Sequence, residues 1–332
     1  MDNAGSAAPL GYAGPPVGPQ PAPLAPAIPL VPGLVDAAGR VAGDVPCRKC
    51  SYNLRGQEAG GRCPECGAPV GVALHGPLLR YGDPEWVRKL ARGAAFVFWG
   101  IIVALVVGFV SVFVSMAAGP LIGPVVYFAG GLVYLYGAWV LTEPDPSGSG
   151  EDRYGTVRKI IRVTLLVSLA QGFFSALTQR SIAAPGLAAA LGMGSVAMEL
   201  VGVVGDFATL SYLGRLAERI PDPALASRAQ LLFWGYGSTR AVSVVARGAS
   251  TLLGLFIPRG AAAGLPAAGT VGVYMGLGCL SLATLVGMLV FGIMYLVFLY
   301  RLQVEFDRQA EYARMVWAGM EAGPPRASGE AV

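Results

Sequence analysis

The chain has 332 residues, of which 54% are hydrophobic and only 13% are charged. An average soluble domain carries about a quarter charged residues, so this composition indicates a membrane protein. The formal net charge of +4 at pH 7 is too small to indicate a protein that binds nucleic acid by bulk electrostatic attraction.

Proline, alanine and glycine dominate residues 1–44. Such a tract has too few large apolar side chains to form a core, so we expect a disordered or polyproline II tether. The tract has no lysine or arginine before Arg40 and no apolar core segment. These features argue against a cleavable signal peptide.

Residues 45–70 contain two Cys-x-x-Cys pairs, Cys47 with Cys50 and Cys63 with Cys66, separated by twelve residues. This is the ligand spacing of a zinc ribbon, in which each tight turn supplies two thiolates to a tetrahedral metal. Four sulfur ligands leave no open position for water or substrate. We therefore predict one structural Zn²⁺ in a small ribbon domain.

The segment 71–93 joins the ribbon to the apolar region and contains an Asp-Pro-Glu-Trp sequence that ends at Trp86. Aspartate is a good helix N-cap, proline suits the first turn, and glutamate is favoured near the positive end of the helix dipole. Trp86 and Leu90 share one face of the predicted helix. Because basic residues lie nearby, we expect an amphipathic helix at the membrane interface.

Residues 94–300 form the predicted membrane domain, an all-α polytopic bundle. Crossing the hydrocarbon core takes roughly 20 apolar residues, and six runs are predicted to cross, at residues 94–118, 121–141, 163–178, 194–213, 231–257 and 270–300. Lysine and arginine concentrate before the first run and in alternate loops, whereas the other loops hold only Arg180 and Arg259. The positive-inside bias then predicts an inner-membrane protein with both termini in the cytoplasm and a C-terminal tail at 301–332.

Two of the expected spans carry ionisable residues seven positions apart, Glu199 and Asp206 on the fourth and Arg240 and Arg247 on the fifth. Seven residues make two helical turns, so each pair lies on one helix face. In two antiparallel helices, residues at the same depth have residue numbers with a constant sum. The sum is the same for Glu199 with Arg247 and for Asp206 with Arg240, so both pairs can lie level with each other. An unpaired charge at mid-membrane costs about 2.5–3.5 kcal/mol, so two interhelical ion pairs are expected.

Two roles remain open for these four charges. Complete pairing favours a structural role, whereas ionisable residues inside a membrane are also typical of a transporter or channel. A further alternative places Arg240 and Arg247 on a surface helix, which would leave five spans and an external C-terminus.

The sixth expected span carries a stripe of small residues at spacings of three and four: Gly272, Gly276, Cys279, Ala283 and Gly287. In lipid, such a stripe lets another helix approach closely. We expect it to pack inside the bundle, with a homo-oligomer as the alternative. Cys279 is expected to act as an inert small apolar residue.

The sequence contains no evident catalytic motif. It has no His-Glu-x-x-His helix, no Walker loop and no Gly-x-Ser-x-Gly elbow, so a membrane enzyme stays open only as the least supported of three function classes. The single histidine, His75, is expected at the surface because four cysteines already saturate a zinc ion. Basic residues of the ribbon are offset by Glu58 and Glu65, which favours a protein partner over nucleic acid.

The ribbon sequence Cys-Arg-Lys-Cys-Ser-Tyr-Asn-Leu-Arg-Gly, followed by Cys-Pro-Glu-Cys-Gly, resembles the zinc-ribbon-headed membrane proteins of planctomycete bacteria. Their ribbons have Cys-x-x-Cys-Gly-Tyr-x-Leu-x-Gly and Cys-Pro-x-Cys-Gly, and the stretch Tyr-Gly-Asp-Pro-Glu-Trp is similar too. The likeness covers residues 47–92 and departs at Ser51, where the pattern has glycine. It implies a bacterial membrane protein of unassigned activity. We expect an interaction, scaffold or sensor protein, with a transporter or channel as the alternative.

Overall fold

The structure is a computed structural model that describes residues 31–118, 122–148, 151–178, 185–256 and 267–321. It contains two short 3-10 helices, η1 (Val70–His75) and η2 (Leu79–Tyr81), and six α-helices: α1 (Pro84–Ala118), α2 (Ile122–Leu141), α3 (Glu151–Thr178), α4 (Pro185–Ala217), α5 (Pro223–Phe256) and α6 (Ala267–Glu321). Within these ranges β-structure is limited to isolated bridges, so the predicted all-α class is confirmed.

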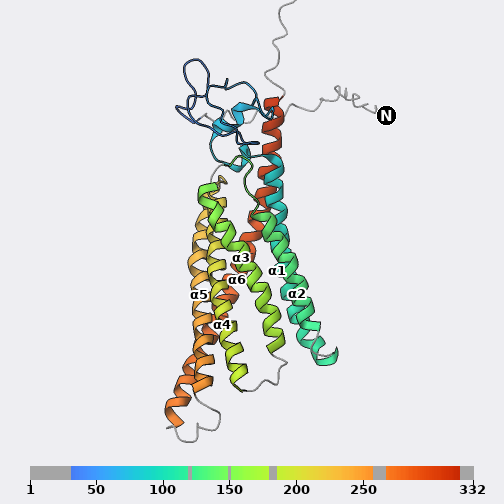
Figure 1. Cartoon of the computed structure of the whole chain (residues 1–332), viewed down its shortest axis with the longest axis vertical. Coiled ribbons are helices and arrows are strands. Elements are labelled where there is room, and N and C mark those ends of the chain that lie inside the picture. Colours follow the sequence, from blue (N-terminus) through green and yellow to red (C-terminus); the bar gives the residue numbers. More distant parts are fainter. Residues whose placement is uncertain (1–30, 119–121, 149–150, 179–184, 257–266, 322–332) are drawn as a thin grey trace, which may run out of the picture.

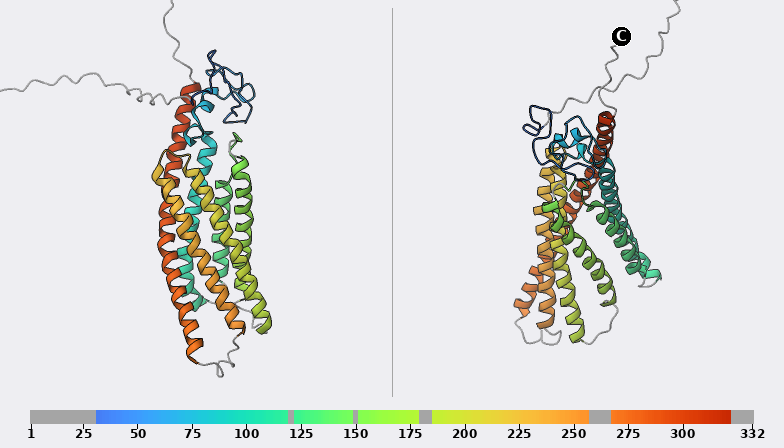
Figure 2. Two further views of the ribbon diagram at one scale, coloured as in Figure 1. Left: turned by 90° about the vertical axis from the view of Figure 1, so that its left-hand side faces the viewer. Right: turned by 45° about the horizontal axis from the view of Figure 1, so that its top comes forward.

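The six α-helices run side by side along the long axis, and residues 31–82, here called the head, sit at one end (Figures 1 and 2). Each helix packs against its neighbours in chain order, and α6 returns to pack against α1. The helices therefore form a closed ring. Glycine allows close approach within it: a Cβ added at Gly93 of α1 would lie 2.6 Å from the backbone nitrogen of Leu141 on α2.

Three helical segments are long and apolar enough to cross a membrane: Pro84–Val110, Leu191–Ala217 and Met275–Met320. Large apolar side chains are also exposed on the outside of the ring, among them Phe109, Trp234 and Leu285. Soluble monomers rarely expose contiguous apolar surface of this kind, whereas a lipid environment requires it. These features are those of a membrane protein.

The start of α1 differs from the prediction. Its N-cap is Asp83 as expected, because Asp83 Oδ1 accepts hydrogen bonds of 2.8 and 3.0 Å from two backbone N–H groups of the first turn. The helix then continues unbroken to Ala118. Trp86 and Leu90 are 5% and 0% exposed and pack in the protein core. The interfacial amphipathic helix predicted within 71–93 is therefore wrong, because protein and not lipid covers its apolar face.

Residues 31–44 belong to the folded head, although the sequence predicted them as disordered. Val41 is buried, and its backbone N–H donates to the carbonyl of Gln57 at 2.9 Å. Isolated bridges join Val35 to Val41 and Arg40 to Glu58. The predicted boundary at residue 45 was too late because these pairings are non-local and leave no periodic pattern. Residues 1–30 lie outside the described part of the chain.

Helix α6 has 55 residues and includes most of the predicted C-terminal tail. At 1.5 Å per residue it is about 80 Å long. Near its end, Trp317 is 7% exposed and packs in the hydrophobic cluster of the head beside Leu54, Leu74 and Tyr81. The head and the end of the last helix therefore lie at the same end of the ring (Figure 1).

The small-residue stripe of α6 is largely open. Nothing lies within 4 Å of a Cβ added at Gly272 or Gly276, and Cys279 and Ala283 are exposed. Gly287 alone of the five packs as expected, where a Cβ would lie 2.8 Å from Thr239 Cγ2 of α5. Packing inside the bundle is thus wrong for most of the stripe, because no described side chain covers these positions closely. The homo-oligomer stays a prediction.

Candidate metal centre, joint and charge pairs

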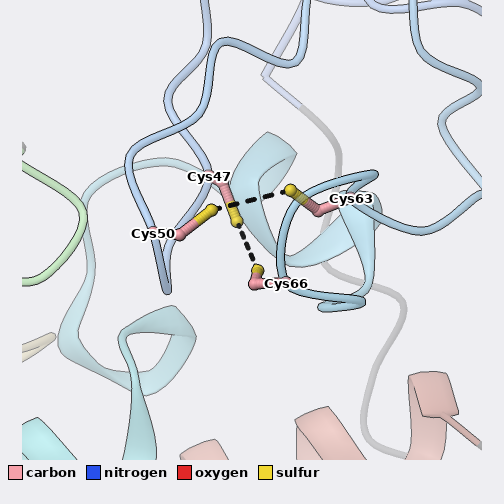
Figure 3. Close-up of side chains that lie close together, drawn as sticks. All are labelled: Cys47, Cys50, Cys63 and Cys66. Carbon is pink, nitrogen blue, oxygen red and sulfur yellow. Dashed lines mark hydrogen bonds between the residues drawn. The ribbon is translucent and has the colours of Figure 1, made fainter.

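The four cysteine sulfurs of the head come together at one point (Figure 3). All lie within 4.8 Å of one another, with 3.6 Å between the sulfurs of Cys47 and Cys66 and 3.7 Å between those of Cys50 and Cys63. These distances are far longer than a disulfide, and all four are free cysteines. Tetrahedral coordination with metal–sulfur bonds of about 2.3 Å places sulfurs about 3.8 Å apart. The group therefore fits a tetrahedral metal ion.

The two Cys-x-x-Cys loops are built alike, with an offset of 16 residues. The N–H of Ser51 donates to the carbonyl of Cys47 at 3.1 Å, and the N–H of Gly67 donates to the carbonyl of Cys63 at 2.9 Å. The offset is kept by the two flanking β-bridges, Pro46 with Asn53 and Arg62 with Pro69. Two equivalent loops thus face each other across the metal position.

Backbone N–H groups also repeat around the sulfurs. The second and third residues after Cys47 donate to its sulfur, as do the second and third residues after Cys63. Burial raises the pKa of the Cys47 thiol, and these donors oppose that rise because they stabilise a negative sulfur. For Cys47 burial outweighs these donors and the pKa stays raised, whereas for Cys63 the donors outweigh burial and the pKa is lowered. The thiolate is the form that binds a metal.

Ser51 occupies a strained position. Its φ is +59°, and at the equivalent position of the second loop Gly67 has a φ of +72°. Both loops therefore place a residue with positive φ directly after their second cysteine. A side chain costs roughly 1–2 kcal/mol in this conformation, and glycine avoids that cost.

His75 takes no part in the metal group, which consists of the four cysteines alone among the described residues. It is half-buried and not a surface residue, because its ring stacks on Tyr81 with 4.7 Å between ring centroids. Tyr81 is itself buried and packs beside Trp317 in the cluster of the head. His75 therefore contributes to the packing between the ribbon and α6.

A buried arginine fastens the head to the ring. Arg219, just beyond α4, donates from Nη2 to Asp145 Oδ2 in the α2–α3 loop at 2.9 Å and from Nε to the carbonyl of Pro77 at 2.8 Å. Its guanidinium lies over the ring of Trp86, 5.2 Å from the centroid. Arg219 and Asp145 are 7% and 9% exposed. We call these four residues the joint.

The metal-binding loop touches this joint. Arg48, which lies between Cys47 and Lys49, donates from its guanidinium to the carbonyl of Gly76, next to Pro77 of the joint. Burial lowers the pKa of Arg48, and the nearby charge of Arg219 lowers it further. Sequence analysis missed the joint because Arg219 resembled the other loop arginines, and no local pattern distinguishes a buried arginine from an exposed one.

The four charged residues of α4 and α5 form two ion pairs, with the partners that the antiparallel register predicts. Arg247 Nη1 lies 2.7 Å from Glu199 Oε1, and Arg240 Nε lies 3.5 Å from Asp206 Oδ2. The pairs differ in environment. The Glu199 side chain is 7% exposed, while that of Asp206 is 34% exposed and its pair is longer. The Glu199 pair is therefore the tighter contact.

Comparisons of the chain with protein-family models, with curated proteins and with solved structures gave no match. The resemblance of the ribbon to planctomycete membrane proteins stays a prediction based on its own motif. Function is therefore inferred from the geometry of the head, the joint and the ring.

Loss of one thiolate should release the metal. We expect the full-length protein to carry one equivalent of metal and Cys63→Ser to lose most of it, because a serine hydroxyl is a poor ligand for this kind of site. Elemental mass spectrometry of the purified proteins measures this, with Cys279→Ser as the matched control that keeps its metal. A Cys63→Ser protein with stoichiometric metal would contradict the four-thiolate site.

Relief of the strained turn should strengthen metal retention. Ser51→Gly is expected to stabilise the loop by about 1 kcal/mol, so metal transfer to a chelator should slow by about fivefold. Gly67→Ser introduces the same strain into the second loop and should speed transfer. Equal rates for wild type and Ser51→Gly would show that the positive φ costs nothing here.

The ion pairs should be coupled in energy. In a double-mutant cycle of Glu199→Ala and Arg247→Ala, we expect a coupling of about 1–2 kcal/mol, and a smaller one for Asp206 with Arg240 because that pair is longer. Unfolding in bicelles gives the free energies. Strict additivity at Glu199 and Arg247 would mean that the pair contributes no net stability.

Proposed function

We propose that this chain is a six-span membrane protein whose cytoplasmic head, held by one structural Zn²⁺, is a protein-binding module of a scaffold or sensor. The observation behind this proposal is the joint. Because a buried ion pair and the packing of Trp317 attach the head to the ring, the head is a fixed part of the membrane domain and not a freely tethered domain. A fixed head is suited to placing a binding surface at the membrane.

The six-span count is supported by the position of the head and of the end of α6 on the same side of the ring. The head precedes α1 and packs against the end of α6, which requires an even number of crossings between them. Helices α3 and α5 have 28 and 34 residues, more than the roughly 20 that a crossing needs. Basic residues gather at the head end, including Arg92 on α1, Arg162 on α3 and Arg215 on α4, and the positive-inside bias then favours a cytoplasmic head.

Zinc is the metal that the ligand set supports best. Four thiolates in a closed tetrahedral arrangement suit Zn²⁺ or iron, and zinc ribbons use this ligand set to hold a fold and not to catalyse. When bound, the metal supplies a cross-link between the two loops. The residues Cys47, Cys50, Cys63 and Cys66 would hold it.

Charge balance on the head favours a protein partner. Arg55 pairs with Asp44 at 3.6 Å, and Glu58 and Glu65 add two further acidic side chains to the head. The basic residues of the head are thus partly offset by acidic ones, whereas proteins that bind phosphates concentrate basic charge on one face. Tyr52, 37% exposed beside the metal loops, is the kind of aromatic residue enriched at protein interfaces.

A transport function for the charged residues of α4 and α5 is the second candidate. The observation in its favour is the Asp206–Arg240 pair, which is longer than the Glu199–Arg247 pair and in which the aspartate side chain is 34% exposed.

Site-specific photo-crosslinking in cells tests the proposed function. With a photoreactive amino acid in place of Tyr52, we expect a discrete protein adduct that disappears when Cys63→Ser is added. The matched control is Tyr136, an aromatic residue of α2 that is 58% exposed on the ring. The binding role of the head would be refuted if position 52 gave no protein adduct, or one unaffected by Cys63→Ser.

The proposed topology has its own test. A reporter that is active only in the cytoplasm should be active when fused after Val332 and inactive when inserted between α5 and α6. An inactive C-terminal fusion would contradict six crossings with a cytoplasmic head.

A further inference from the structure

Three tyrosines from three different helices lie close enough to Asp206 to interact with its charge. They are Tyr134 of α2, Tyr236 of α5 and Tyr295 of α6, and each interacts electrostatically with the Asp206 carboxylate. The hydroxyls of Tyr134 and Tyr295 share a hydrogen bond, and the rings of Tyr236 and Tyr295 stack with 5.8 Å between centroids. We call the three tyrosines the tyrosine cluster. With Asp206 of α4, four helices contribute polar groups to this region.

The cluster lies on the inner side of the ring. Helix α2 packs mainly against α1 and α3, yet Tyr134 reaches residues on α4 and α6. Those side chains meet only if they point towards the common axis. Gly100 of α1 allows this, because a Cβ there would lie 3.4 Å from the Cα of Tyr134. Asp206 is about 16 Å from the head end of α4, well inside the expected bilayer.

Asp206 is held less firmly than the other acidic residue of α4. Its one ion-pair contact is Arg240 Nε at 3.5 Å, whereas Glu199 is held at 2.7 Å by Arg247. The Asp206 side chain is also 34% exposed, against 7% for Glu199. Asp206 therefore keeps part of its carboxyl group accessible within the ring.

The groups that face Asp206 stabilise both of its charge states. Arg240 and Tyr236 come from α5, Tyr134 from α2 and Tyr295 from α6. On α3, the Thr164 side chain packs against Gly205, the residue before Asp206. Thr164 does not titrate, and its hydroxyl donates to the carbonyl of Ile160. A tyrosine hydroxyl can donate to a carboxylate or accept from a carboxylic acid. A tyrosine hydroxyl near Asp206 can therefore interact favourably with it both before and after Asp206 takes up a proton.

We propose that Asp206, together with the tyrosine cluster, is a proton-binding site in the membrane domain. A proton taken up from the aqueous phase forms an O–H bond with an Asp206 carboxylate oxygen, the carboxylate becomes a neutral acid, and its ion pair with Arg240 is lost. No electron transfer is involved. This inference rests on the proposal that α4 and α5 cross the bilayer, and it gives the second candidate function a specific ligand. Ionisable groups in such positions are the usual sites of proton transfer in membrane proteins.

Infrared difference spectroscopy of the full-length protein in nanodiscs tests the site. On moving from neutral to mildly acidic buffer, the wild type should gain a carbonyl band of a protonated carboxyl group, and Asp206→Asn should lack it. Glu199→Gln is the matched control and should keep the band. Tyr134→Phe and Tyr295→Phe should shift the band because they remove polar hydroxyl groups near the acid, whereas Tyr136→Phe should leave it in place.

Two outcomes would overturn the inference: a wild-type spectrum without such a band, or a band that survives in Asp206→Asn. If Asp206→Asn does not fold, Asp206→Glu takes its place in the test. This variant keeps a carboxyl group at the site, so the band must remain but change in frequency, and an unchanged band would contradict the assignment to Asp206. The C-terminal reporter is measured independently. A cytoplasmic C-terminus without an Asp206 band refutes only the proton site, whereas an external C-terminus refutes the topology on which it rests.

Discussion

The guanidinium group of Arg219 is the point on which the relative placement of head and ring depends. A buried arginine must have its N–H groups satisfied, and here the partners come from Asp145, Pro77 and the face of Trp86. Removing one partner from such a buried pair typically costs about 3–5 kcal/mol, because a charge is left without compensation. The ribbon linker, the start of α1, the α2–α3 loop and the end of α4 must therefore come together as one unit.

The joint also connects the four-cysteine group to the ring. Arg48 follows a metal-binding cysteine directly and donates to Gly76, one residue before the Pro77 carbonyl that Arg219 uses. The same loops bury Leu54 in the cluster that receives Trp317. Loss of the metal would thus loosen two attachments of the head at once, one polar and one apolar.

Features that depend on sequence spacing were predictable. The two Cys-x-x-Cys pairs fix their own geometry because each loop closes locally, and the positive φ at Gly67 follows from the same turn. The partners of Glu199 and Asp206 followed from helical periodicity and antiparallel order alone. The 16-residue offset between the loops was also visible in the sequence, since Cys47, Cys50 and Ser51 match Cys63, Cys66 and Gly67.

Features that depend on tertiary contacts were not predictable. The apolar face of Trp86 and Leu90 looked suited to lipid, and only the arrival of other segments shows that protein covers it. Val41 looked like part of a flexible tract until its partner Gln57 was placed. The tyrosine cluster escaped notice because tyrosines are common at membrane interfaces, and nothing local indicates that Tyr134 and Tyr295 face each other.

Helix α6 joins the far end of the ring to the head without a break between Ala267 and Glu321. A rod of about 80 Å turns a small rotation into a large displacement: a change in tilt of about 5° moves its end by roughly 7 Å. Membrane helices adjust to bilayer thickness mainly by tilting. Because Trp317 near the end of α6 packs in the head, a change in bilayer thickness that tilts α6 would displace or strain the head, so lipid composition becomes a mechanical input to the cysteine cluster.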